Sequence, residues 1–439
     1  MSSLQQRETF RTSRLLAFAS ERELTAQIGH RREQWPRVAV KELVDNAIDA
    51  CEEHGIPPEI RVRVAHDRIE VGDNGPGIAE DVVADVLDFA VRVSSREAYV
   101  GPTRGAQGNA LKTLVAMPFA RDGEHGLVEI ESRGVLHRIA FAIDQIAQEP
   151  QAERSTKPSL VRNGTVVRIR WPDSASSILT TSGSTIRRDL YRFAVFNPHL
   201  GLTAALFGEP LDFKATDPGW RKWRPGDPLP PQWFNHERFV RLLAATLHHD
   251  QTRNGRVRLV SEFLDQFRGL SGTAKQKRIL GALGLARARL DALVRDGDID
   301  HELAARLLTA MQVESRAVKP EALGIIGPDH LLARLPLGQV GRGSFTYRKR
   351  VDDDPCSPRL AEIAFAFDDD TLDRRQLLCG LNFSPALNDA GAFRELGHDG
   401  LGGLLGRQYA DGGAPIAFVL HLTGARLAFT DRGKSAVAL

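Results

Sequence analysis

Three short segments, in a fixed order, constrain the fold of this 439-residue chain more than any other feature. The first, residues 42–50, places Glu42 and Asn46 one helical turn apart. The second places Asp73 directly before a glycine turn, and the third, residues 104–108, is a further glycine loop at a similar spacing. A helix and two loops of this kind are what a nucleotide-hydrolysing pocket needs.

The segment around Glu42 is predicted to be a helix over residues 36–54. Pro36 suits the first helical position because its missing N–H is not needed there. Glu42, Asn46 and Asp49 then share one face of the helix. A carboxylate at Glu42 can take a proton from a water that attacks a phosphate. The side-chain oxygen of Asn46 can bind Mg²⁺, which prefers oxygen ligands.

The two glycine loops can supply the remaining contacts of a nucleotide. Asp73, at the predicted end of a strand, can accept a hydrogen bond from the exocyclic amine of adenine, and the glycines after it let the backbone approach the base. Residues 101–113 contain a glycine loop before a helix that begins near Asn109. Its backbone N–H groups can bind phosphates, and Arg104 and Lys112 add positive charge.

Each segment alone also has an ordinary structural interpretation. An amphipathic surface helix explains the acids, a strand-to-turn sequence explains Asp73, and a flexible loop explains the glycines. The loop is not a P-loop, because it lacks the Gly-Lys-Ser/Thr ending of that motif. The hydroxyl of Thr165, which opens another strand, can hold Asp73 or a water beside it. The nucleotide-binding interpretation therefore depends on the combination and its order.

The rest of the chain predicts alternating sheets and helices. Alternating apolar and β-branched residues indicate a hairpin over 59–72 and strands at 127–131, 136–142 and 164–171. A helix is predicted at 185–196, a proline-rich boundary at 208–232, and a helical region at 235–311. Short strands return at 360–367, 377–381 and 415–421, with a helix near 390–411.

Together the motifs resemble the Bergerat-type (GHKL) nucleotide fold of type II topoisomerase ATPase subunits, MutL, Hsp-type chaperones and histidine kinases. Within this superfamily the chain most resembles the B subunit of DNA topoisomerase VI. Similar segments beyond the pocket are residues 10–15, 196–199, 263–280 and 430–435.

The resemblance implies an α+β fold with four parts. These are an N-terminal arm over 1–35, a GHKL ATPase domain with an α/β sandwich over 36–232, a helix–two-turns–helix-like insert over 233–322, and a transducer-like α/β domain over 323–439.

The resemblance also implies a role for individual residues. Glu42 is the general base, Asn46 is the Mg²⁺ ligand, Asp73 binds adenine, and Gly77 closes the base pocket. Lys434 is the transducer-loop lysine that reaches the γ-phosphate of ATP; a solvated lysine near the chain end is the alternative. The catalytic set is Glu42 and Lys434, and the set that binds ATP and Mg²⁺ is Asn46, Asp49, Asp73, Gly75, Gly77, Ile78, Arg104, Gly105, Gln107, Gly108 and Thr165.

Two features depart from the family pattern. Asn109 stands where a more glycine-rich lid is expected. The sequence ends five residues after Lys434, so we expect a transducer-like domain without the long helical stalk that docks on the DNA-cleaving subunit. Without the stalk, the usual partnership with the DNA-cleaving subunit and the coupling of ATP hydrolysis to strand passage are both open.

Charge and composition limit the partners. The net charge of +2 is too small to indicate nucleic acid, so DNA contact has to come from local patches. Two basic clusters are candidates: Lys275, Lys277, Arg278, Arg287 and Arg289, and Arg221, Lys222 and Arg224 interleaved with Trp220 and Trp223. None of the four tyrosines has a context suited to attack on DNA, so cleavage is expected to belong to a separate tyrosine-bearing subunit.

Three functional hypotheses follow. The leading one is an ATP-dependent dimerising clamp like the B subunit of topoisomerase VI, cytoplasmic and associated with the nucleoid, with no membrane partner. The second is a histidine kinase, which the short leader of about 35 residues with His30 as its only histidine disfavours. The third is a GHKL ATPase switch that acts on DNA or protein partners without topoisomerase activity.

Overall fold

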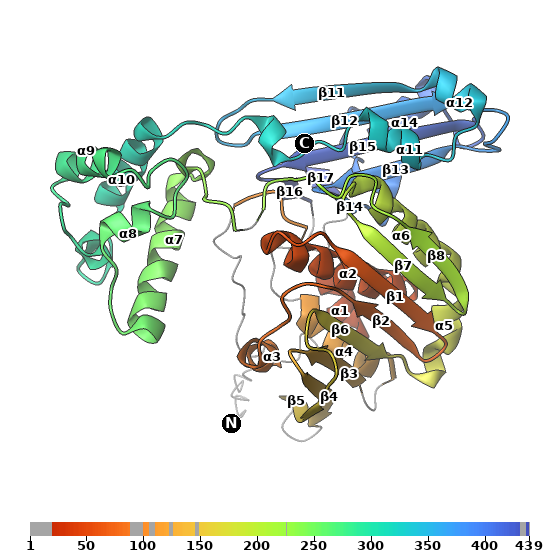
Figure 1. The fold of residues 1–439 in the computed structure, drawn as a ribbon, viewed down its shortest axis with the longest axis horizontal. Coiled ribbons are helices and arrows are strands. Elements are labelled where there is room, and N and C mark those ends of the chain that lie inside the picture. Colours follow the sequence, from red (N-terminus) through yellow and green to blue (C-terminus); the bar gives the residue numbers. More distant parts are fainter. Residues whose placement is uncertain are drawn as a thin grey trace, which may run out of the picture.

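The structure, a computed structural model, describes residues 20–87, 100–104, 110–122, 126–144, 149–224, 226–430 and 436–438. Two large sheets and a separate group of helices make up this mixed α+β chain (Figure 1). Segment 10–15, the loop residues Gly105, Gln107, Gly108 and Asn109, and Lys434 lie outside the described residues. None of the helices in the described ranges is both long and apolar enough to cross a bilayer.

The larger sheet has eight strands in the order β5-β4-β3-β6-β2-β1-β7-β8. Their bounds are β1 (Glu59–Ala65), β2 (Arg68–Gly72), β3 (Gly126–Ser132), β4 (Val135–Asp144), β5 (Glu149–Pro158), β6 (Thr165–Arg170), β7 (Gly201–Leu206) and β8 (Glu209–Phe213). The predicted hairpin over 59–72 is present as antiparallel β1 and β2, and β1 also pairs parallel with β7. The sheet therefore joins segments from both ends of the first 213 residues.

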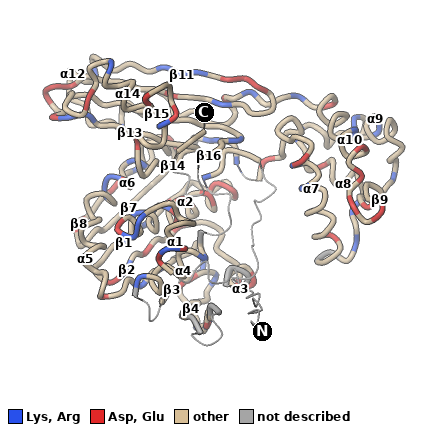
Figure 2. The backbone as a smooth tube through the Cα atoms, turned by 180° about the vertical axis from the view of Figure 1, so that it is seen from behind, with Lys and Arg blue, Asp and Glu red and all other residues tan. Residues whose placement is uncertain are grey.

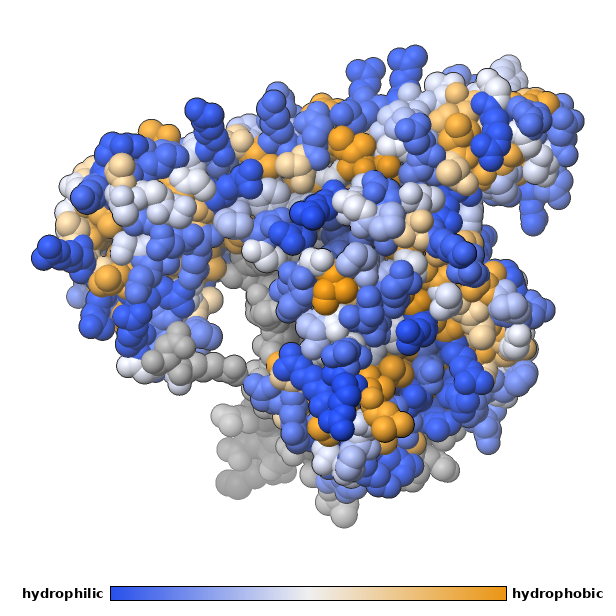
Figure 3. Space-filling model, viewed as in Figure 1, coloured by the Kyte–Doolittle hydropathy of each residue, from blue (hydrophilic) through white to orange (hydrophobic). Residues whose placement is uncertain are grey.

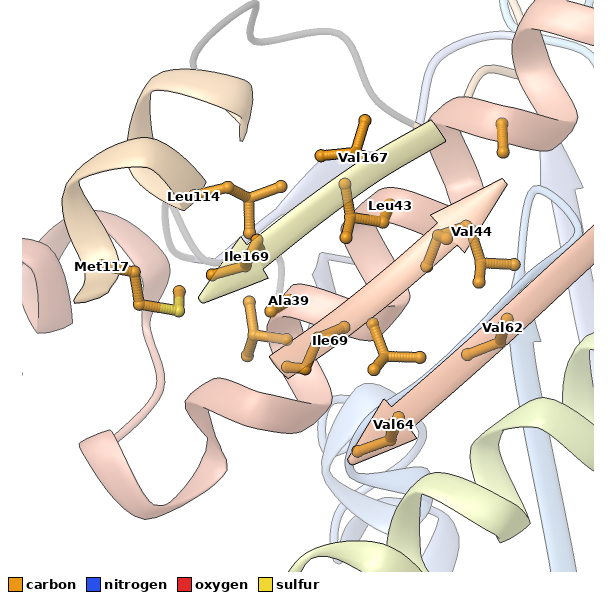
Figure 4. Packing of buried hydrophobic residues seen from close by; sticks show 14 of the residues in the cluster. Ala39, Leu43, Val44, Val62, Val64, Ile69, Leu114, Met117, Val167 and Ile169 are labelled. Carbon is orange, nitrogen blue, oxygen red and sulfur yellow. The ribbon is translucent and has the colours of Figure 1, made fainter. Parts of the chain in front are cut away.

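Helices pack on one face of this sheet. They are α1 (Glu21–Ile28), α2 (Trp35–Glu53), α3 (Glu80–Leu87), α4 (Ala110–Asp122), α5 (Ser176–Thr181) and α6 (Gly183–Phe196). Burial alternates along β1, so one sheet face meets the helices and the other meets solvent. Leu43 and Val44 of α2 and Leu114 of α4 pack with Val62 of β1 and Ile169 of β6 in the core (Figure 4). This packing fixes α2 against the strands that end at the candidate site.

A second unit is helical and lies to one side of both sheets (Figure 1). It contains α7 (His236–His249), α8 (Val260–Leu264), α9 (Thr273–Leu283), α10 (His301–Glu314) and the short pair β9 (Val294–Arg295) and β10 (Asp298–Ile299). Its core includes the contacting aromatic rings of Phe239, Phe263 and Phe267. The unit thus has a hydrophobic core of its own.

The smaller sheet has five strands in the order β11-β12-β15-β13-β14. The strands are β11 (Thr346–Asp352), β12 (Arg359–Phe367), β13 (Gln376–Leu381), β14 (Ser384–Pro385) and β15 (Ile416–Gly424), followed by the pair β16 (Ala428–Phe429) and β17 (Val437–Ala438). The associated helices are α11 (Pro328–Arg334), α12 (Gln339–Ser344), α13 (Asp389–Ala392) and α14 (Gly400–Arg407). One apolar face packs toward α6 and α11, and the opposite face packs toward α13 and α14.

The prediction of one helix near 390–411 is wrong. Two short helices, α13 and α14, stand there instead, separated by residues 393–399. The segment is rich in glycine, which lowers helix stability by about 1 kcal/mol per residue relative to alanine. Its apolar residues, such as Phe393 and Leu401, are buried against the sheet all the same.

Polar contacts hold the smaller sheet to the helices of the larger one. Arg37 of α2 makes two hydrogen bonds to Asp189 of α6, at 2.8 and 2.9 Å, and a third to the carbonyl of Leu387 at 3.1 Å. Arg192 of α6 pairs with Asp389 of α13. The catalytic helix proposed from the sequence therefore touches both sheets.

Candidate nucleotide site

Helix α2 is buried along almost its whole length. From Trp35 to Glu52, Asn46 is the one exposed residue. The side chain of Glu42, about 6 Å earlier along the helix axis, keeps 32% of its surface accessible. The side chains of Asn46 and Glu42 are therefore accessible to a ligand, although most of helix α2 is buried against the rest of the domain.

Asp73 follows β2 and is held by backbone groups. Its Oδ1 accepts hydrogen bonds from the N–H of Gly75 at 2.8 Å and the N–H of Thr165 at 3.1 Å. Within the described ranges both bonds end on Oδ1, so Oδ2 is the oxygen available to a ligand. Burial raises the pKa of Asp73, although these two N–H groups oppose the shift. The contact from Thr165 comes from its backbone, whereas the sequence suggested its hydroxyl.

The glycines around Asp73 are required by close backbone contacts. Gly164 has a φ of +75°, and a Cβ there would stand 1.9 Å from the carbonyl oxygen of Asp73. A Cβ on Gly77 would lie 2.7 Å from Oγ of Ser132. That hydroxyl accepts a hydrogen bond from the N–H of Ile78 at 2.8 Å and donates one to the carbonyl of Gly164 at 3.1 Å. Ser132 thus fixes the turn, and nothing in its sequence spacing indicated this role.

Asn74 attaches the same turn to the end of α2. Its Oδ1 accepts hydrogen bonds from the N–H of Glu59 at 2.9 Å and from Sγ of Cys51 at 3.3 Å, and its Nδ2 donates to the carbonyl of Pro57 at 3.0 Å. The Asp73 turn therefore lies beside the last turns of α2, about 7 Å along the axis from Asn46. A ligand can extend from Asp73 along α2 toward Asn46 and Glu42.

Behind this surface lies a buried polar cluster centred on Glu52. Arg104 makes hydrogen bonds of 2.6 and 2.8 Å to the two oxygens of the Glu52 carboxylate. Nζ of Lys222 and Nε2 of His199 also lie 2.9 and 3.0 Å from these oxygens. Asn197 accepts a further hydrogen bond from Arg104. The cluster joins α2, the end of α6 and the segment after β8.

The charges of this cluster shift its pKa values in opposite directions. Burial alone would raise the pKa of Glu52, but Arg104, Lys222 and the hydrogen bond with His199 outweigh it and hold that pKa well below its usual range. Burial lowers the pKa of His199, and Glu52 only partly offsets this. His199 is then a neutral imidazole that donates from Nε2 to Glu52.

Two expected nucleotide contacts belong to this cluster. Arg104 has no exposed side-chain surface and donates to Asp49 at 2.6 Å. Three acidic residues on α2 attract its guanidinium inward, and contact of Asp49 and Arg104 with a nucleotide stays a prediction. Lys112, expected to add charge, is likewise 2% exposed.

One of the two predicted basic patches lies only partly on the surface, because Arg221 is exposed and Arg224 is half-buried. Lys222 is buried beside Glu52, and Trp223 is buried in the core of the helical unit. In the second patch, Arg278 makes bonds of 2.6 and 2.9 Å to Glu314, and Lys275 donates to the carbonyl of Gly269. Lys277 is exposed. Lys and Arg are interspersed with Asp and Glu along the helical unit (Figure 2).

The exposed amide of Asn46 fits the chemistry of Mg²⁺, which takes few protein ligands and keeps several waters and phosphate oxygens. Among the described side chains, no cluster of three or more His, Cys, Asp or Glu residues could hold a metal. A single amide oxygen at Asn46 thus suits a Mg²⁺ ion whose other ligands are the phosphate oxygens of the nucleotide and water.

Comparison with known proteins defines the class. Residues 32–175 match the family model described as "Histidine kinase-, DNA gyrase B-, and HSP90-like ATPase". This range contains α2, the Asp73 turn and Thr165. This segment is therefore similar to the ATPase domains of that family, and the predicted GHKL resemblance is confirmed.

Sequence similarity to individual proteins likewise covers only part of the chain. The B subunit of type 2 DNA topoisomerase 6 from Archaeoglobus fulgidus is 29% identical over 171 residues, which is 37% of this chain and 28% of that protein. The subunit of the same name from Thermococcus gammatolerans is 43% identical over 91 residues, 19% of this chain and 16% of that protein. The predicted resemblance to the B subunit of topoisomerase VI is confirmed.

The matches leave most of these relatives uncovered. The matched part covers 28% of the Archaeoglobus fulgidus subunit and 23% of the Natronomonas pharaonis subunit, so the chain spans only about a quarter of their length. Among solved structures, the ATPase region of Saccharomyces cerevisiae topoisomerase II bound to ICRF-187 (dexrazoxane) aligns with a TM-score of 0.41 and 11% identity, over 92% of this chain and 77% of that one.

Proposed function

We propose that this chain is a Mg²⁺-dependent ATPase that acts as an ATP-driven dimer clamp, as the B subunit of a type IIB DNA topoisomerase does. The observation that carries the proposal is the exposure of Asn46, with Glu42 one turn away, on a helix that is otherwise buried. Catalysis of this kind consists mainly of positioning and charge neutralisation.

Each residue has a defined task in this proposal. Oδ2 of Asp73 accepts a hydrogen bond from the exocyclic amine of adenine, while Gly77 and Ile78 border the base. The Asn46 oxygen holds Mg²⁺, which neutralises phosphate charge when it is bound. Glu42 takes the proton of the attacking water. Gly75 shapes the turn, Gly105, Gln107 and Gly108 contact phosphates, and Lys434 reaches the γ-phosphate.

We also propose the division of labour along the chain. Residues 1–35 form an arm, 36–232 the ATPase domain, 233–322 a helical insert, and 323–439 a transducer-like domain. ATP closes two copies of the chain around DNA in the cytoplasm, and a separate tyrosine-bearing subunit cleaves the DNA.

The assignment of the base is tested with Glu42→Ala. We expect the variant to bind ATP as tightly as the unaltered chain and to lose at least about a hundredfold in turnover, because only proton removal from water is lost. Isothermal titration calorimetry and a phosphate-release assay measure the two quantities. Glu53→Ala, at the exposed end of the same helix, is the matched control and keeps full turnover. Undiminished turnover in Glu42→Ala would refute the assignment.

A GHKL switch without topoisomerase activity is the second candidate. It is favoured by the burial of Lys222 and Trp223, which reduces one of the two basic patches that could contact DNA. Relaxation of supercoiled DNA by the purified chain with a tyrosine-bearing subunit encoded beside it would exclude this candidate. ATP turnover that responds to a protein partner and not to DNA would support it.

A further inference from the structure

Asp45 lies on α2 between Glu42 and Asn46, and it points into the protein rather than toward the site. Its relative exposure is 3%. Its Oδ2 lies 2.7 Å from Nζ of Lys41 and accepts a 2.7 Å hydrogen bond from Oγ of Ser384. Its charge is thus paired with Lys41 at Oδ2, while Oδ1 lies 3.8 Å from Nε of Arg104, as a buried carboxylate needs a cationic partner.

Lys41 connects this carboxylate to the proposed base. Its Nζ lies 3.9 Å from Oε1 of Glu42 while it donates to Asp45. Burial lowers the pKa of Lys41, but the charges of Asp45 and Glu42 outweigh burial and raise it. The ammonium is therefore charged, and its position depends on where the Asp45 carboxylate lies.

Ser384 comes from the smaller sheet, 339 residues away in sequence from Asp45. It is 6% exposed and belongs to β14, where it pairs with Leu381 of β13. The neighbouring Phe383 donates its N–H to Nε2 of His421 at 3.0 Å, and its carbonyl accepts from Nδ2 of Asn197 at 2.9 Å. The Ser384 hydroxyl is thus presented to Asp45 by a backbone that is fixed on both sides.

We infer that Ser384 is a positioning residue for hydrolysis at Glu42, acting through Asp45 and Lys41. The inference rests on the proposed ATPase function. Without the hydroxyl, Oδ2 of Asp45 loses one of its two partners, and the carboxylate and Lys41 lose their fixed orientation. Glu42 then spends less time in the geometry that removes a proton from water, whereas nucleotide binding, which does not involve Asp45, is unchanged.

The test compares Ser384→Ala with the unaltered full-length chain in a steady-state ATPase assay. We expect kcat to fall about tenfold, the effect of removing one hydrogen bond to a charged group, with KM and the calorimetric Kd for ATP unchanged. Ser384→Thr, which keeps the hydroxyl, should recover most of the lost kcat. A merely structural serine would not lower kcat while leaving KM, the Kd for ATP and the stability of the fold unchanged.

Ser344→Ala is the matched control, because Ser344 also lies in this part of the chain and its hydroxyl makes three hydrogen bonds, with the N–H and carbonyl of Phe367 at 2.9 and 2.7 Å and with the carbonyl of Gly341 at 3.2 Å. It should keep the kcat of the unaltered chain. Unchanged kcat in Ser384→Ala, or an equal loss in Ser344→Ala, overturns the inference. If the proposed function itself is wrong, the unaltered chain shows no turnover that depends on Glu42, so the two failures are distinguishable.

Discussion

At the scale of single residues, the site depends on positions where no other side chain fits. The carbonyl of Asp73 approaches Gly164 so closely that even a methyl group would displace it. Strand β6 begins at the next residue, Thr165, whose N–H donates a hydrogen bond to the Asp73 carboxylate. Under the proposed function, a change at Gly164 would therefore act on adenine binding without touching adenine.

We expect Gly164→Ala to weaken ATP binding by at least about tenfold, because the backbone of Asp73 must move and its carboxylate loses the Thr165 contact. Fluorescent-nucleotide titration measures this. Gly284→Ala is the control for backbone strain alone, since Gly284 has a φ of +69° and a Cβ there would meet no atom within 4 Å. It should cost about 1 kcal/mol of stability and leave ATP affinity unchanged. Equal affinities for all three proteins would contradict the role of Gly164.

His330 ties α11 to α6 and makes stability depend on pH. Its Nε2 donates to the carbonyl of Val195 at 2.9 Å, and burial lowers its pKa to about 4 from 6.5. Between these values the unfolded chain binds the extra proton and the folded chain does not. Stability therefore rises with pH from about 4 to 6.5, and the cost of acidification reaches about 3 kcal/mol.

We expect His330→Gln to flatten this part of the stability profile, because glutamine does not titrate. Urea unfolding at intervals between pH 4 and 7 measures the profile. His398→Gln, at a residue with an exposed side chain, should leave the slope as it is. A slope that persists in His330→Gln would show that other groups cause it.

At the scale of elements, α2 was the most predictable part of the chain. Its observed bounds differ from the predicted 36–54 by one residue at each end, because Pro36 and the apolar pattern act locally. Its polar faces were harder to predict. Spacing placed Glu42, Asn46 and Asp49 together, but which of them a distant segment covers is decided by tertiary packing. Arg104 covers Asp49, and no local pattern encodes that contact.

The same limit applies to the strands. β6 and the β1–β2 hairpin were predicted from alternating apolar and polar residues, whereas β5, which is largely polar and exposed, carried no such pattern. The Asp73 turn was recognised from its glycines and acid. Its supports, Ser132 and the backbone of Thr165, come from strands that become neighbours only in the folded sheet.

The buried cluster makes α2 sensitive to the loss of Arg104. We expect Arg104→Met to destabilise the chain by about 3–5 kcal/mol, because it leaves Glu52 and Asp49 buried without their main cationic partner. Chemical denaturation measures the change. Arg241→Met breaks the exposed pair with Glu237 and should cost less than about 1 kcal/mol. Similar losses in the two variants would argue against a special role for the cluster.

At the scale of the whole molecule, the two sheets are joined through α2 and α6 rather than by strand pairing. Arg37, Arg192 and Ser384 each cross between them with hydrogen bonds. Hydrophilic residues cover most of the face seen in Figure 3, with hydrophobic ones in scattered patches. Because these polar contacts are directional and reach α2, a change at the proposed nucleotide site would have a physical route to the second sheet.

The Glu52 cluster also sets an order of events during synthesis. The carboxylates of α2 leave the ribosome first, Arg104 follows 52 residues after Glu52, and His199 follows 147 residues after it. Strand β1 likewise cannot form its parallel pairing with β7 until β7 has been synthesised. Glu52 therefore lacks one or more of its partners until Lys222 has emerged, when about half of the chain has been made.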